Sequence, residues 1–155
     1  AKPVPVNTRN FTKIRKGIFW VSFAGPLSNL VLGILSVILA SISYNFLPDF
    51  GLKENLEGML IFSLIINFIL MGFNMIPLPP LDGSRMVASF LKGEILQKYE
   101  AFARFTPMIF LVAIFLSFQG VNTFGYILMP FIAAALWICE LVGYPGLLFL
   151  KTLRA

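Results

Sequence analysis

The sequence contains no histidine, one cysteine and few charged residues. The single cysteine, Cys139, excludes a disulfide within the chain, and its position in an apolar run indicates that it serves packing. Charged residues make up 12% of the chain, against about 25% in soluble domains. A soluble fold of 155 residues could not hide a sequence that is 58% hydrophobic. The composition therefore predicts a membrane protein that crosses the bilayer several times.

The formal net charge is +5, which by itself would suit a nucleic-acid partner. The basic residues, however, stand at the ends of apolar runs, as they do in membrane proteins. We therefore expect the lipid bilayer as a partner and no nucleic acid.

Four apolar runs are the expected membrane spans: 17–47, 58–76, 105–119 and 124–142. A spanning helix needs about 20 apolar residues, so the third run is short. Residues 48–57 are expected to form a polar loop, 83–104 short helices at the membrane interface, and 1–16 an extended juxtamembrane segment. The prediction is an all-α, polytopic membrane protein with about four transmembrane helices, forming one membrane-embedded domain over 1–155.

The basic residues also predict an orientation. If the four spans alternate, eleven of the 12 basic residues fall on one side and only Lys53 on the other. By the positive-inside rule, both ends of the chain are then cytoplasmic, in a membrane of the bacterial cell type. Glu140, near the end of the fourth run, is expected to reach the interface rather than to serve as a buried acid.

Small and polar residues recur at three- and four-residue steps in the first span, which predicts a face for close helix packing. They are Ser22, Gly25, Asn29, Gly33, Ser36, Ala40 and Ser43. Pro26 would kink this span or mark its first turn. In the second span Ser63, Asn67 and Asn74 share a face, and we expect Asn67 to hydrogen-bond between helices.

The stretch from Asn74 to Arg85 carries the strongest functional signal. Pro77, Pro79 and Pro80 remove backbone donors and must end a helix, while Asp82-Gly83 turns the chain into the next one. A carboxylate beside a broken helix end at membrane depth is a candidate functional group. Asp82 could also simply cap the following helix, and Arg85 could pair with it or face lipid headgroups.

The run N-x-x-P-x-P-P-L-D-G, from Asn74 to Gly83, resembles the second zinc-ligand motif of the site-2 protease family of intramembrane zinc metallopeptidases. Gly25-Pro26-Leu27-Ser28-Asn29 is similar to the family's G-P-x-x-N element, and residues 1–7 resemble the segment that precedes it. The resemblance implies that Asp82 is a Zn²⁺ ligand and that Asn74 lies at the active site, donating hydrogen bonds to the oxyanion or the substrate. Asn29 either contributes to those surroundings or serves packing. The implied substrates are membrane proteins, cut in or near their transmembrane segments.

The chain departs from this family in one respect. The family's first motif, H-E-x-x-H, supplies two zinc ligands and the general base, and a chain without histidine lacks it. The chain begins with Ala1, after the position where that motif would stand, so we expect a portion of a longer protein. The isolated chain is expected to show neither proteolysis nor tight zinc binding. The alternative is a non-catalytic membrane scaffold or an inactive relative that binds membrane clients. A transporter is disfavoured because no matching pair of broken helices occurs in two halves. Oligomeric state stays open.

Overall fold

The computed structural model describes residues 11–49 and 51–145, and all regular structure in these ranges is helical. The helices are α1 (Phe11–Phe46), α2 (Lys53–Met75), α3 (Asp82–Phe90), α4 (Gly93–Ala103), α5 (Thr106–Phe118) and α6 (Thr123–Leu141). Three of them, α1, α2 and α6, are long and apolar enough to cross a membrane. The pair α4–α5, bent by 43°, would be a fourth crossing if it is taken as one span. The all-α, multi-pass prediction is thus confirmed.

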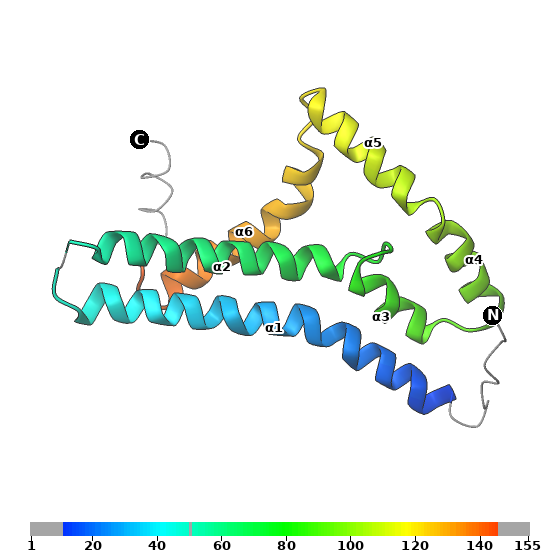
Figure 1. Ribbon diagram of the computed structural model, residues 1–155, viewed down its shortest axis with the longest axis horizontal. Coiled ribbons are helices and arrows are strands. Elements are labelled where there is room, and N and C mark those ends of the chain that lie inside the picture. The colour runs from blue at the N-terminus through cyan, green and yellow to red at the C-terminus, as the bar shows by residue number, and fades with distance from the viewer. Residues whose placement is uncertain (1–10, 50, 146–155) are drawn as a thin grey trace.

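Helices α1 and α2 lie side by side as an antiparallel hairpin (Figure 1). The small-residue face of α1 is the face that packs here, since Gly33, Ser36 and Ala40 are all buried. Ser36 and Ser63 join the two helices by a hydroxyl hydrogen bond of 2.9 Å. Such close approach through small side chains is how helices associate where lipid removes the hydrophobic driving force.

Helix α6 completes the core by packing its second half against α2. Ala135 and Cys139 are fully buried in a cluster with Leu64 and other residues of the hairpin, so the packing role expected for the cysteine is confirmed. Glu140 is exposed at the end of this helix, as expected of a residue that reaches the interface. At the α6 end, the Ser41 hydroxyl donates to the Val142 carbonyl.

The end of α6 lies at the same end of the molecule as the α1–α2 connection (Figure 1). The Tyr44 and Tyr144 rings pack edge to face there, with centroids 5.5 Å apart. Strict alternation of four spans would put the end of α6 beside α3 instead. The 13 residues of α5 extend only about 20 Å against a hydrocarbon core of about 30 Å, so α5 is long enough to cross a membrane only together with α4. Lys151 and Arg154, which entered the charge count, lie outside the described residues.

Several local expectations are corrected. The expected extended segment is helical from Phe11 onward, and its first ten residues lie outside the described ranges. Pro26 lies inside α1, not in its first turn, and the helix bends in the blue part of the ribbon that contains it (Figure 1). A proline inside a helix bends it because it removes one hydrogen bond and its ring crowds the preceding turn.

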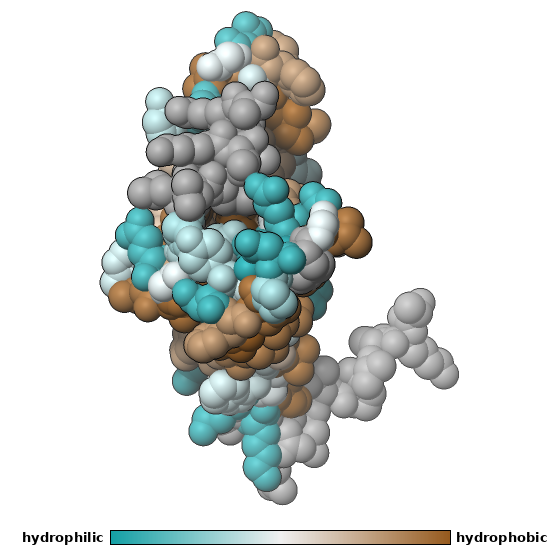
Figure 2. Space-filling model, turned by 90° about the vertical axis from the view of Figure 1, so that its left-hand side faces the viewer, coloured by the Kyte–Doolittle hydropathy of each residue, from teal (hydrophilic) through white to brown (hydrophobic). Residues whose placement is uncertain are grey.

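The loop expected at residues 48–57 is shorter than predicted, because α2 begins at Lys53. The Lys53 ammonium donates to the Leu47 carbonyl at 2.8 Å and so closes the turn. Glu57 is buried on the hairpin face, where it accepts a hydrogen bond of 3.0 Å from Ser43. Hydrophilic residues gather on this end of the molecule, which faces the viewer in Figure 2.

Asn67 behaves differently from the interhelical role predicted for it. Its amide donates to the Ser63 carbonyl of its own helix at 2.8 Å. It reaches α1 only indirectly, because the Ser63 hydroxyl that it also approaches is bonded to Ser36. A donor in a membrane helix can be satisfied by the carbonyl one turn before it, so no partner on another helix is required.

Candidate functional site

The proline stretch ends α2 and sets the start of α3. Helix α2 stops at Met75, and the chain between the helices makes short turns, with Leu78 N–H donating to the Ile76 carbonyl and Leu81 N–H to the Leu78 carbonyl. The Pro79–Pro80 peptide bond is cis. The helix end predicted from the three prolines is confirmed, since the missing donors leave no ladder to continue.

Gly83 explains how the two helices come so close. A Cβ on Gly83 would lie 2.4 Å from the Met75 carbonyl oxygen and 2.6 Å from that of Ile76. These are backbone atoms, so they cannot move aside without shifting the end of α2. The glycine of the D-G pair therefore seats the first turn of α3 directly on the end of α2, next to Asn74.

Asp82 is the first residue of α3 and does not cap it, which corrects the capping alternative. The capping position is held by Leu81, whose backbone is extended, and no side chain makes the capping hydrogen bond. Asp82 already has helical geometry, one residue too late for its carboxylate to fold back onto the turn. The carbonyl of Leu81 instead accepts from the Ser84 hydroxyl at 2.7 Å.

The Asp82 carboxylate is half-buried, and among the described residues it has no hydrogen-bond or ion-pair partner. A carboxylate that is held at a helix start but left free by its neighbours can accept a ligand such as a metal ion.

Helix α1 approaches this carboxylate at Gly25. A Cβ placed on Gly25 would lie 2.9 Å from Oδ2 of Asp82, so the two motifs singled out in the sequence meet in space. Asn29 is half-buried one turn further along α1. Asn74 is half-buried in the last turn of α2, and its side chain makes no hydrogen bond within the described part of the chain. The structure thus brings Asp82 to Gly25 and to the end of α2, with both asparagines on the adjoining turns.

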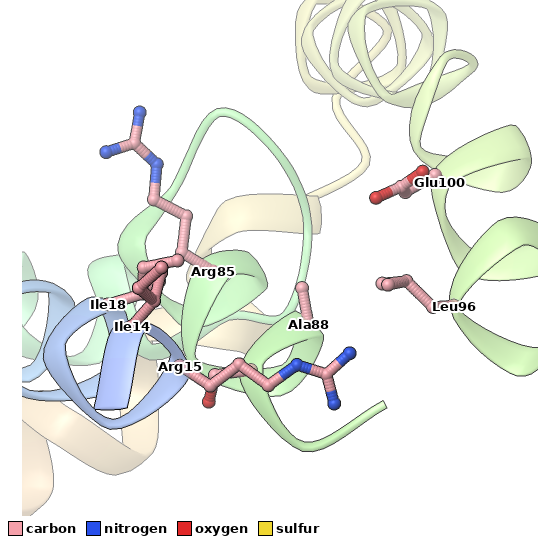
Figure 3. A pocket seen from close by; sticks show the side chains of 8 residues that line it. Ile14, Arg15, Ile18, Arg85, Ala88, Leu96 and Glu100 are labelled. Carbon is pink, nitrogen blue, oxygen red and sulfur yellow. The ribbon is translucent and has the colours of Figure 1, made fainter. Parts of the chain in front are cut away.

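Arg85 does not pair with Asp82 among the described residues. It lines a cavity of about 470 Å³ between the start of α1, α3 and α4, together with Arg15 and Glu100 (Figure 3). The Arg85 guanidinium is directed away from α4, while that of Arg15 extends toward the side where α4 carries Leu96 and Glu100 (Figure 3). The remaining lining residues are Ile14, Ile18, Ala88 and Ser89.

Tyr99 connects α4 to the segment between α2 and α3, from Ile76 to Leu81. The sequence alone did not predict this contact. Its hydroxyl donates to the Pro77 carbonyl at 2.8 Å. Pro79, two residues later, has no N–H to offer that carbonyl, so a side-chain donor takes that place. A tyrosine on a helix 22 residues away gives no local signal in the sequence, and only the fold pairs it with the loop.

Zinc usually takes three protein ligands and one open position at catalytic sites, and carboxylate oxygens are suitable ligands. Asp82 fits as one of them, since its oxygens are unpaired. No group of three or more histidine, cysteine, aspartate or glutamate side chains occurs within residues 11–49 and 51–145 to complete such a set. This part of the chain therefore offers one ligand position.

Comparison with known proteins agrees with this reading of the motifs. Residues 51–114, which include Asn74 and Asp82, match the family model of peptidase family M50. The chain is 31% identical over 136 residues to a Bacillus subtilis (strain 168) protein named "Putative zinc metalloprotease YwhC", covering 86% of this chain and 60% of that protein. It is 39% identical over 67 residues to a protein of Methanocaldococcus jannaschii named "Putative zinc metalloprotease MJ0611", covering 43% of this chain and 31% of that protein.

The chain thus spans 60% or less of the length of these relatives. No solved structure gives a significant match. The residues matched by the family model include the N-x-x-P-x-P-P-L-D-G stretch, and the longer match extends over most of the helices described above. Together, these matches support the site-2 protease family, peptidase family M50, as the family of this chain.

Proposed function

We propose that this chain is part of an intramembrane zinc metalloprotease and that it supplies the aspartate ligand, Asp82. The observation that carries the proposal is the free, half-buried Asp82 carboxylate at the start of α3, inside the stretch that matches the M50 family. The two remaining ligands and the general base belong to an H-E-x-x-H helix that this chain does not contain, so the isolated chain is inactive.

The chemistry is hydrolysis of a peptide bond. Zinc, when bound, lowers the pKa of a coordinated water to about 7 and so makes hydroxide available at neutral pH. Asn74, in the last turn of α2, donates hydrogen bonds from its amide to the substrate backbone or to the developing oxyanion. A single well-placed donor of this kind contributes about 10²–10³-fold to the rate.

The substrates are transmembrane segments of other proteins. Irregular backbone at membrane depth is tolerated only where protein or a wet cavity covers it, and the segment from Ile76 to Leu81 is such backbone. Hydrolysis needs water at the same place. The carbonyls of Pro79 and Pro80 accept no hydrogen bond from the described residues, and in this proposal they accept from an unwound substrate strand.

In this proposal, the end of the molecule that carries Asp82 faces the cytoplasm. The described basic residues other than Lys53 all lie at the start of α1 or in the stretch from α3 to the residue directly after α4, and Lys53 lies at the opposite end. They are Lys13, Arg15, Lys16, Arg85, Lys92, Lys98 and Arg104. Such one-sided charge is the basis of the positive-inside rule. The end of α6 then lies on the far side of the membrane.

A second candidate is a scaffold that binds membrane clients without cutting them. It is favoured by one observation, the absence of histidine from the sequence. The two functions differ in their need for the carboxylate. A scaffold keeps its client after Asp82→Asn, whereas the protease loses activity.

The test is a cleavage assay with the full-length protein in proteoliposomes and a single-span membrane substrate. Loss of an outer-sphere partner of a metal ligand costs about 10–100-fold, so removal of the ligand itself in Asp82→Asn should lower cleavage by at least about 100-fold. Asp49→Asn is the matched control, because Asp49 is fully exposed in the α1–α2 connection. Equal cleavage by the Asp82→Asn and Asp49→Asn variants would refute the proposal.

A further inference from the structure

We infer that Gly25 is a positioning residue for Asp82: the missing side chain at Gly25 sets where the carboxylate stands. This inference rests on the proposed role of Asp82 as a zinc ligand. It concerns a residue on α1 that is separated from Asp82 by the whole of α2.

A side chain at Gly25 could be accommodated only if the Asp82 carboxylate moved. An ideal Cβ at Gly25 would lie 2.9 Å from Oδ2 of Asp82 and 3.9 Å from its Cγ. Ordinary van der Waals contact begins at about 3.4 Å. An alanine at this position would therefore have to displace the nearer carboxylate oxygen by about 0.5 Å.

The carboxylate, and not the helices, would take up that displacement. Asp82 Oδ2 is at the free end of a side chain with no hydrogen-bond partner among the described residues. The backbone of α1 is held by the bend at Pro26, which is fully buried, and by the Ser28 hydroxyl, which donates to the Gly25 carbonyl at 2.7 Å. The least costly relief is rotation of the aspartate side chain.

Such a rotation matters for a metal ligand and for little else. Zinc–carboxylate bonds are about 2.0–2.2 Å long, and a functional group must be held to within about 0.5 Å of its productive position. The same displacement leaves the helix packing intact, and replacing glycine by alanine favours the helical state of α1. Gly25→Ala should therefore separate zinc binding from stability.

The test uses the full-length, zinc-loaded protein and measures zinc retention against a chelator of known affinity. We expect Gly25→Ala to weaken zinc affinity by about 10–100-fold, the range seen when the support of a metal ligand is lost. Its thermal stability without the metal should equal or exceed that of the wild type. In cleavage, kcat should fall while KM stays nearly constant once zinc is in excess.

Two glycines of the same helix serve as controls. Gly17 has no atom within 4 Å of its Cβ position, so Gly17→Ala should leave zinc affinity unchanged. A Cβ on Gly33 would lie 2.9 Å from the Phe68 ring, so Gly33→Ala disturbs the α1–α2 packing without touching Asp82. It should lower thermal stability and change zinc affinity by less than about threefold.

The outcomes are distinct. If Gly25→Ala binds zinc as the wild type does while Asp82→Asn does not, the inference about Gly25 is wrong and the proposed function stands. If Gly25→Ala and Gly33→Ala lose zinc to the same extent, the effect is general packing and the inference is again overturned. If Asp82→Asn retains wild-type zinc affinity, the proposed function itself fails.

Discussion

The contact between Gly72 of α2 and Phe131 of α6 yields a quantitative prediction. A Cβ on Gly72 would lie 2.4 Å from the Phe131 ring, about 1 Å closer than ordinary contact. Overpacking of this kind costs about 1–3 kcal/mol. We therefore expect Gly72→Ala to lower the free energy of unfolding by about 2 kcal/mol, even though alanine is the better helix former. This contact holds α6 to the half of α2 that leads to Asn74.

The double-mutant cycle with Phe131→Ala tests the cause. Removing the ring creates space for the new methyl group, so Gly72→Ala should cost about 1–2 kcal/mol less in the Phe131→Ala background than in the wild type. The assay is reversible unfolding in mixed micelles, followed by circular dichroism. Met129→Ala is the control partner, because Met129 is 63% exposed and should combine additively with Gly72→Ala. Additivity within about 0.5 kcal/mol for the Gly72–Phe131 pair would refute the packing described here.

Three further predictions concern packing, topology and the site turn. Cys139 is fully buried, so a maleimide should leave it unmodified in the folded protein and label it stoichiometrically on unfolding; rapid labelling of the folded protein would contradict the α6 packing. The topology can be tested with single cysteines introduced at Gly51, Leu141 or Ile95 in a Cys139→Ala background. Those at Gly51 and Leu141 should react with an impermeant reagent added on one side of the membrane, and the one at Ile95 with reagent added on the other side. Strict alternation of four spans would instead place Leu141 on the same side as Ile95. Gly83→Ala should lower the free energy of unfolding by about 1–3 kcal/mol, because the new Cβ would clash with backbone atoms of Met75 and Ile76 that cannot rotate away. An unchanged free energy of unfolding would show that α3 does not pack directly on the end of α2.

The apolar runs predicted the helices well because each run is bounded by polar residues or turns. The runs at 105–119 and 124–142 differ from α5 and α6 by one residue at each end. The start of α2 was misplaced because Glu57 and Lys53 are polar, and polarity in the sequence was interpreted as a loop. Their partners, the Ser43 hydroxyl and the Leu47 carbonyl, are supplied by the fold and leave no periodic signal.

The orientation of the chain in the membrane stays a prediction. Counting basic residues required every apolar run to cross the membrane, and α5 is too short to do so alone. At Gly72 a missing side chain admits the Phe131 ring of α6, and hydropathy does not record such a contact. The conformation of residues 11–16 was predicted wrongly for a related reason: their basic and polar side chains suggested a tail outside the helix, whereas they form the start of α1.

The candidate site could be found from sequence because its motifs are local. Asn74 and Asp82 are eight residues apart, and the prolines between them predict the end of the helix. The contact between Gly25 and Asp82 joins residues on two different helices, so it can be recognised only from the three-dimensional structure. The same holds for Tyr99, which holds the proline loop from α4.

X-ray absorption at the zinc edge of the full-length protein tests most directly whether Asp82 is a zinc ligand. The measurement compares the wild type with the Asp82→Asn variant. The wild type should hold about one zinc per chain, with a carboxylate oxygen at about 2.0–2.2 Å from the metal. In Asp82→Asn that oxygen contribution should disappear and the zinc content should fall. An unchanged zinc content and an unchanged coordination spectrum in Asp82→Asn would show that Asp82 is not a zinc ligand.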